Sequence, residues 1–181
     1  MEEVKCVRLR TNRLELTAAT FDHICAEVES SEHLARLLGT RVEPGWPPGE
    51  YDRDAQEFLG CCLKEGGMSV VGWYVWYAIR QEEEEQSSIL VGAGGYFGPP
   101  SKKGEVEIGF SVMPSSREHG YATEMVQALV SNAFGDARVQ KIVAHTNPDN
   151  IASVKVLMKS GFRYVCLDQE SGNDLFEILR S

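Results

Sequence analysis

The chain lacks a long apolar run. None of its hydrophobic stretches approaches the roughly 20 residues that a membrane-spanning helix needs. The opening residues, Met1-Glu2-Glu3-Val4-Lys5, also lack the apolar segment of a secretory leader. We therefore expect a protein that has no membrane partner and acts in the cytoplasm.

Cysteine is scarce and follows no ligand pattern. The five cysteines form no C-x-x-C pair; they are Cys6, Cys25, Cys61, Cys62 and Cys166. Adjacent cysteines such as Cys61 and Cys62 are more typical of small side chains packed along a helix than of metal or redox groups. We expect reduced thiols and no metal site.

Positive charge is also in short supply. The 18 Lys and Arg residues face 27 Asp and Glu residues, which gives a formal net charge of −9. Such a surface repels the phosphates of nucleic acids and anionic lipids, so general binding to either class is excluded. Four of the acidic residues form the run Glu82-Glu83-Glu84-Glu85. We expect a solvated hairpin loop there, because adjacent carboxylates repel one another and resist burial.

The remaining composition is that of one globular domain. A chain of 181 residues that is 43% hydrophobic can bury a sizeable core. Neither an internal repeat nor a linker divides it, so residues 1–181 are predicted to form a single domain. Periodicity and Gly/Pro punctuation predict strands at 8–16, 70–80, 88–97, 105–113, 141–145, 162–167 and 175–179, with helices at 20–38, 52–64, 121–134 and 150–160.

One turn in the middle of the chain carries the strongest functional signal. It reads Ser116-Arg117-Glu118-His119-Gly120-Tyr121-Ala122-Thr123-Glu124 and joins a predicted strand to a strongly periodic helix. The first N–H groups of a helix lack intrahelical partners and lie at the positive end of its dipole, so they bind anions such as phosphate. Gly120 lets the backbone approach a ligand, and Arg117 adds positive charge. From these residues alone, an ordinary strand-to-helix connection is the alternative.

Neighbouring segments extend this pattern over nearly the whole chain. Around the turn, Arg117-x-x-Gly120-x-Ala122 follows Glu107-Ile108-Gly109-Phe110. Downstream come Asn147-Pro148-Asp149-Asn150-Ile151-Ala152-Ser153-Val154-Lys155-Val156-Leu157 and Gly161-Phe162; upstream lies Leu9-Arg10-Thr11-Asn12-Arg13-Leu14-Glu15-Leu16. The first two patterns resemble the acyl-CoA motif and the second motif of the GCN5-related N-acetyltransferases (the GNAT superfamily). The upstream segment is similar to the opening strand of the ribosomal-protein-acetylating, RimJ/RimL-like branch.

This resemblance implies both a fold and a donor. The fold is α/β (α+β), with a mixed, mostly antiparallel central sheet that contains a splayed pair of strands and is flanked by helices. The implied cofactor is acetyl-CoA, whose pantetheine arm would lie between the splayed strands and pair with the main chain of Phe110, Val112 and Met113. The residues implied to hold its pyrophosphate are Arg117, Glu118, His119, Gly120, Tyr121, Ala122 and Thr123.

The implied activity is transfer of an acetyl group from acetyl-CoA to a primary amine, by direct attack in a ternary complex. A protein N-terminus is the acceptor that the resemblance favours. A small-molecule amine, such as an antibiotic, a polyamine or a metabolite, is the alternative acceptor. An acyl-CoA-binding sensor with little turnover is the alternative outside enzymes. A monomer and a homodimer are both compatible with the sequence.

Glu107 is the first candidate for the general base or for the residue that holds a water in that role. An alkylamine is mostly protonated at neutral pH, so a carboxylate or an ordered water must accept its proton. Strand alternation places Glu107 on the face opposite Val106 and Ile108, and the resemblance places a glutamate here near the acceptor amine. The alternative is a solvated strand carboxylate like Glu105.

Asn150 and Ser153 are candidates at the start of the following helix. Asn150 is positioned to cap that helix, and similar enzymes use an asparagine here to bind the pantetheine arm. In the ribosomal-acetylating branch, a serine at the position of Ser153 is the candidate that reprotonates the thiolate. Many other family members use a tyrosine four residues further on, where this chain has Leu157. Hydrogen bonding by Ser153 without proton transfer, or protonation by solvent, remains open.

Four further positions depart from the family pattern or carry little signal. Glu118 stands where similar enzymes commonly have glycine, so its carboxylate should turn outward or weaken CoA binding. His145 ends a predicted strand, and a lone histidine is more often a hydrogen-bonded structural residue than a base. His23 and His33 lie in a predicted helix and carry no signal.

The acceptor side has no diagnostic motif. The segment 42–51 is rich in Pro and Gly and occupies the region that covers the acceptor pocket in similar proteins. Trp46 and Tyr51 are therefore candidates for lining that pocket. Equally, both are candidates for anchoring the loop on the core.

Overall fold

The computed structural model describes residues 7–49, 51–81 and 87–181. Cys6 and the four glutamates of the expected hairpin loop lie outside the described residues. The elements in chain order are β1 (Arg8–Arg10), β2 (Leu14–Ala18), α1 (Phe21–Glu29), α2 (Ser31–Leu38), α3 (Arg53–Gly66), the 3₁₀ turn η1 (Gly67–Val70), β3 (Val75–Gln81), β4 (Ser88–Tyr96), β5 (Glu105–Val112), the 3₁₀ turn η2 (Pro114–Ser116), α4 (Tyr121–Gly135), β6 (Lys141–Thr146), α5 (Ile151–Lys159), β7 (Arg163–Leu167) and β8 (Asp174–Leu179).

The strands form one eight-stranded sheet in the order β1-β2-β3-β4-β5-β6-β8-β7. Neighbouring strands are antiparallel except for β5 and β6, which pair in parallel. A parallel pair needs a crossover connection, and α4 supplies it. The mixed, mostly antiparallel sheet expected from the sequence is confirmed.

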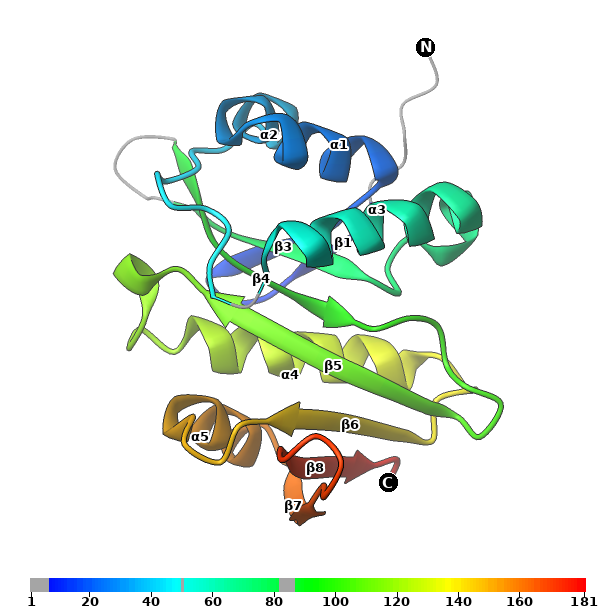
Figure 1. The fold of residues 1–181 in the computed structure, drawn as a ribbon. Helices are drawn as coiled ribbons and strands as arrows, with labels where there is room; N and C mark the ends of the chain where they lie inside the picture. Colours follow the sequence, from blue (N-terminus) through cyan, green and yellow to red (C-terminus); the bar gives the residue numbers. More distant parts are fainter. Residues whose placement is uncertain (1–6, 50, 82–86) are drawn as a thin grey trace.

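Helices cover both faces of this sheet. In Figure 1, α1, α2 and α3 gather at the top, while α4 passes behind β5. Met125 and Leu157, from α4 and α5, belong to the apolar cluster on one face. Ile24, Leu34 and Leu63, from α1, α2 and α3, belong to the cluster on the other face. The two clusters make the central strands apolar on both sides.

Three boundaries differ from the sequence-based expectation, each for a local reason. The strand expected at 8–16 is a hairpin, because Thr11 donates its N–H to Leu14 O at 2.9 Å and closes a turn. The helix expected at 20–38 breaks at Ser30, whose extended backbone ends α1 and whose side chain accepts the N–H of His33 to cap α2. The strand expected at 70–80 begins only at Val75, after a turn at Gly72 with φ +92°. From β4 onward the strands, and both α3 and α5, agree with expectation to within two residues.

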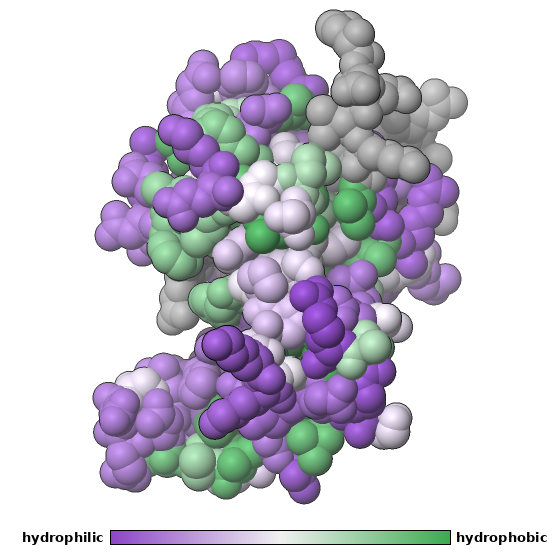
Figure 2. Space-filling model, turned by 90° about the vertical axis from the view of Figure 1, so that its right-hand side faces the viewer, coloured by the Kyte–Doolittle hydropathy of each residue, from purple (hydrophilic) through white to green (hydrophobic). Residues whose placement is uncertain are grey.

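The described cysteines and the surface hydropathy are compatible with this fold. Cys25, Cys61, Cys62 and Cys166 are free thiols. Among the described residues, no helix combines the length and apolar character needed to cross a membrane. On the face shown in Figure 2, hydrophilic side chains form much of the outline and hydrophobic ones lie in separate patches between them.

A buried carboxylate, Glu27 of α1, joins the segment 42–51 to the core. Its two oxygens accept Trp46 Nε1–H at 2.6 Å, the Tyr51 hydroxyl at 2.6 Å and the Tyr77 hydroxyl at 3.0 Å. Burial raises the pKa of Glu27, and the hydrogen bonds it accepts act against that rise. Burial and the neighbouring carboxylate both raise the pKa values of Tyr51 and Tyr77, so the two hydroxyls remain donors. The segment is thus held by one side chain of a packed helix.

Replacing this carboxylate should be costly. Glu27→Ala is expected to lower the free energy of unfolding by about 3 kcal/mol, because buried donors lose their acceptor. Urea unfolding followed by tryptophan fluorescence measures the change. Glu29→Ala is the matched control on the same helix; its carboxylate is exposed and pairs with His33, so the change should stay within about 0.5 kcal/mol. Equal effects for the two variants would contradict the anchoring role.

Candidate active site

The pairing of β5 with β6 stops early and leaves the two strands splayed. Their register pairs Glu105 with Lys141 and continues only as far as Glu107 with Val143. Both strands extend further, to Val112 and Thr146, without pairing with each other. The splayed pair expected from the sequence is therefore present, and it opens toward the end of β5 from which the chain enters α4.

The pairing of β5 with β4 on its other edge determines which main-chain groups of β5 face this opening. Met113 donates its N–H to Val91 O at 2.8 Å and accepts the Ser116 N–H at 2.8 Å, so both of its main-chain groups are already engaged. Main-chain groups alternate in direction along an antiparallel pair, so those of Phe110 and Val112 point away from β4 and toward the opening. Of the three residues expected to pair with a pantetheine arm, Phe110 and Val112 are thus the better placed.

The turn between β5 and α4 presents free amide groups. Gly120 occupies the N-cap position of α4 with φ +81°, and no side chain in the described part of the chain caps the first turn. Uncapped N–H groups at a helix start form an anion site, which fits a pyrophosphate. Arg117 lies at the start of this turn; it is exposed, and its Nε donates to Val112 O at 3.3 Å. This bond ties its guanidinium to the end of β5.

The other residues of the turn keep the backbone in place. The His119 ring stacks on Tyr121 with ring centres 5.6 Å apart, and its Nδ1 lies 2.7 Å from Arg117 O. Glu118 is exposed and has φ +64°, the sole positive φ of a non-glycine residue in the described chain. A side chain is disfavoured in this left-handed conformation, which explains why glycine suits the position.

Glu107 does not stand alone on its strand. Its Oε1 lies 2.8 Å from His145 Nδ1, on β6, and the two side chains are 38% and 30% exposed. The pair sits where β5 and β6 part, on the face opposite Val106 and Ile108. A carboxylate oxygen accepts hydrogen bonds, so His145 is the donor, from Nδ1, in this contact. The sequence suggested a structural histidine at this position; only the strand register reveals that it shares a proton with Glu107.

An exposed aromatic ring, that of Phe97, lies close to Gly109, two residues beyond Glu107 on β5. A Cβ on Gly109 would come within 3.1 Å of the Phe97 ring, and Phe97 is 63% exposed. Phe97 also donates its N–H to Glu107 O at 3.0 Å. The sequence held no signal for this residue apart from its place at a strand end.

Gly49 and Glu43, from the described part of the segment 42–51, lie close to β5 and to the turn that follows it. A Cβ on Gly49 would lie 2.7 Å from Ser111 Oγ, and the Ser115 hydroxyl donates to Glu43. Trp46 is 8% exposed and Tyr51 is half-buried, both on the Glu27 carboxylate. These contacts match the loop-anchor alternative, while a role in lining an acceptor pocket stays a prediction.

Across the opening, α5 begins at Asn150. The Oδ1 atom of Asn150 accepts the Ser153 N–H at 3.1 Å, which confirms the N-cap and leaves the Asn150 amide N–H groups exposed. Ser153 is half-buried, whereas Leu157 is buried in the core beneath α5. No side-chain acid therefore stands at position 157.

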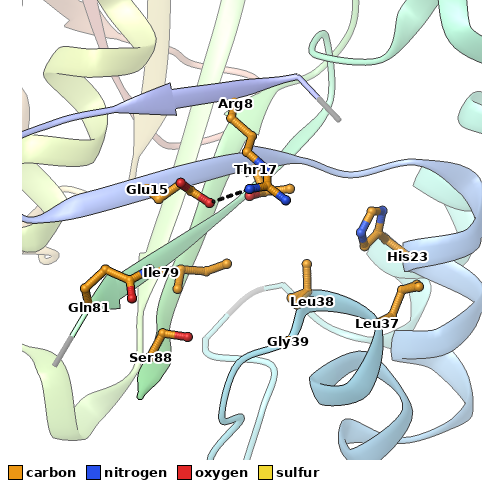
Figure 3. A pocket seen from close by; sticks show the side chains of 10 residues that line it. All are labelled: Arg8, Glu15, Thr17, His23, Leu37, Leu38, Gly39, Ile79, Gln81 and Ser88. Carbon is orange, nitrogen blue, oxygen red and sulfur yellow. Dashed lines mark ion pairs between the residues drawn. The ribbon is translucent and has the colours of Figure 1, made fainter. Parts of the chain in front are cut away.

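A cavity of about 290 Å³ lies elsewhere, between α1, α2 and the β1–β3 end of the sheet (Figure 3). It shares no residue with the β5–β6 opening; its lining consists of Arg8, Glu15, Thr17, His23, Leu37, Leu38, Gly39, Ile79, Gln81 and Ser88. Arg8 and Glu15 form an ion pair across it at 3.2 Å. Burial lowers the pKa of His23, whose Nδ1 accepts the Thr20 N–H at the start of α1. We assign the candidate active site to the β5–β6 opening on its chemistry.

Comparisons with known proteins identify the family of the chain. Residues 9–163 match the family model described as acetyltransferase (GNAT) domain. The uncharacterized N-acetyltransferase YjdG of Bacillus subtilis (strain 168) is 30% identical over 156 residues, which cover 86% of this chain and 89% of YjdG.

Solved structures share the fold at lower identity. Mycobacterium smegmatis RimJ in complex with CoA-disulfide has a TM-score of 0.63 and 18% identity, covering 96% of this chain and 86% of RimJ. The ribosomal L7/L12 alpha-N-protein acetyltransferase RimL in complex with coenzyme A has a TM-score of 0.65 and 16% identity, covering 96% of this chain and 98% of RimL. The family match, the extent of the similarity to YjdG and the site geometry agree: the chain belongs to the GNAT family and is an acetyltransferase.

Proposed function

We propose that the chain uses acetyl-CoA to acetylate a primary amine by direct attack in a ternary complex. The observation that carries this proposal is the splayed β5–β6 opening, which has an uncapped helix start at one end and the Glu107–His145 pair at its origin. An anion site and a proton acceptor are thereby placed along one strand. This is what an acyl-CoA donor and an amine acceptor require of the protein.

On the donor side, the proposed contacts are made by main-chain groups, one cation and one side-chain amide. The amides of residues 118–123 and the Arg117 guanidinium bind the pyrophosphate, while Phe110, Val112 and the Asn150 amide bind the pantetheine arm. Bound acetyl-CoA supplies a thioester carbonyl that is open to attack by an amine. Similarity to proteins solved with CoA supports this assignment.

On the acceptor side, Glu107 takes the proton of the incoming ammonium group, directly or through a water. The 2.8 Å hydrogen bond from His145 to Oε1 orients the carboxylate for this transfer. The partial exposure of both side chains lets an amine or a water reach them. Ser153, at the start of α5, donates a hydrogen bond to the departing thiolate.

A protein N-terminus is the acceptor we favour. The net charge of −9 suits a cationic amine, and RimL and RimJ share the fold. The test is release of CoA from acetyl-CoA with two panels: N-terminal peptides, including ribosomal ones, and small amines such as polyamines and amino sugars. Saturable turnover with peptides alone supports the proposal, whereas turnover with small amines alone overturns the acceptor. Tight CoA binding with no turnover on either panel would favour an acyl-CoA sensor.

Glu107→Gln is expected to lower kcat by about 100-fold, because the amide cannot accept the proton of the acceptor amine. Affinity for CoA, measured by calorimetry, should stay within about twofold, because Glu107 lies away from the proposed pyrophosphate turn. The dependence of kcat/KM on pH should also differ from that of the wild type. Glu105→Gln is the matched control on the same strand face, since Glu105 pairs with Lys141 at 2.6 Å. An unchanged rate and pH profile for Glu107→Gln would remove Glu107 as the base.

Glu118 offers a test of the turn itself. Glu118→Gly is expected to stabilise the protein by about 1 kcal/mol, because glycine adopts a positive φ without strain. It should also tighten CoA binding, because a negative charge beside the proposed phosphate site is removed. Glu118→Gln separates the two effects: it removes the charge, keeps the strain and should improve only the binding. Calorimetry and thermal unfolding provide both readouts, and weaker CoA binding in both variants would show that Glu118 contacts the ligand favourably.

A further inference from the structure

The turn between β1 and β2 binds the first turn of α4 through Glu124. Glu124 Oε1 accepts the Thr11 hydroxyl at 2.6 Å and the Arg13 N–H at 2.8 Å. Its Oε2 accepts Arg13 Nε at 2.8 Å and Arg13 Nη2 at 2.7 Å. Both oxygens of one helix carboxylate are therefore occupied by donors from a segment more than 100 residues away in sequence.

Arg13 also contacts the turn that precedes α4. Its Nη1 donates to His119 O at 2.9 Å, and its guanidinium carbon lies 4.8 Å from the centre of the Tyr121 ring. A Cβ on Gly120 would lie 3.4 Å from Arg13 Nη2. The guanidinium thus lies against the backbone of residues 119–121 on the side of the His119 carbonyl.

This contact fixes the direction of an amide group. The peptide between His119 and Gly120 is planar and trans, so its carbonyl and its N–H point in opposite directions. With the carbonyl held by Arg13, the Gly120 N–H is directed to the other side of the turn. The turn needs such a restraint, because Glu118 and Gly120 both have positive φ and no side chain within the described residues caps α4.

We propose that Arg13 is a positioning residue for the pyrophosphate turn, held by Glu124, whose carboxylate is itself fixed by the Thr11 hydroxyl. This inference rests on the proposed function, because it assumes that the turn binds CoA. Arg13 acts through the His119 carbonyl, and its own charge is paired with Glu124. The planar fork is required for the role, because Nε and Nη2 engage Glu124 while Nη1 engages the backbone.

The charge state of Glu124 supports a permanent link. Burial acts to raise the pKa of Glu124, but the hydrogen bonds from Thr11 and Arg13 outweigh it and leave the pKa below its ordinary value. A lowered pKa means that the link contributes stability above the ordinary glutamate range and loses it as pH falls. At neutral pH the Arg13–Glu124 pair is therefore fully formed.

The decisive variant is Arg13→Lys, which keeps the charge and loses the fork. Its Kd for CoA, measured by calorimetry, is expected to rise about tenfold, as is the inhibition constant for inorganic pyrophosphate. In kinetics, KM for acetyl-CoA should rise with kcat unchanged at saturation. Activity with S-acetylpantetheine, which has no pyrophosphate, should not change. Arg10→Lys is the matched control, because Arg10 is exposed on β1 and pairs with Glu15.

Glu124→Gln is the second variant, should Arg13→Lys fold poorly. It is expected to raise the Kd for CoA by a similar factor, and the double variant should lose little more, because both residues act as one unit. A Kd for CoA within twofold of wild type in either folded single variant overturns the inference. So does an equal loss of activity with S-acetylpantetheine, which would indicate general disruption. If wild-type protein itself fails to bind CoA, it is the proposed function that fails.

Discussion

The short parallel pairing of β5 with β6 is the constraint on which the site depends. A parallel pair requires a crossover, and here the crossover helix α4 starts just beyond the end of β5. The uncapped start of α4 and the place where the strands part must therefore lie at the same end of the sheet. Because β5 keeps its antiparallel partner β4 on the other edge, its free main-chain groups are directed into the opening. One topological feature thus sets both the proposed anion site and the strand that serves it.

Sequence reasoning recovered what is locally encoded. The turn at Arg117 and Gly120, the cap at Asn150 and the strand alternation that exposes Glu107 all follow from neighbouring residues, and the structure contains each of them. Apolar periodicity failed where a polar side chain competes for the backbone. Ser30 breaks an expected single helix by capping its second half, and a turn at Thr11 divides the first strand.

Contacts between distant segments could not be predicted in the same way. His145 contacts Glu107, 38 residues away in sequence, because β5 and β6 are neighbours in the sheet. Arg13 contacts Glu124, 111 residues away, because α4 packs beside the β1–β2 turn. Nothing local marks these residues, since an arginine in a turn and a histidine at a strand end are ordinary. Glu27 is a similar case, because its sequence position suggests an exposed helix face and its four aromatic and amide partners come from other segments.

Glu27, Glu124 and Glu107 differ in their exposure and in how many of their oxygens accept hydrogen bonds. Glu27 is buried and holds the segment 42–51, and Glu124, 15% exposed, holds the β1–β2 turn against α4. Each has donors on both oxygens, so neither is free to accept a proton from a substrate. Glu107 is 38% exposed and, among the described side chains, is bonded to His145 through one oxygen. Glu27 and Glu124 are thus engaged on both oxygens in holding separate segments together, whereas Glu107 accepts the hydrogen bond from His145 on one oxygen.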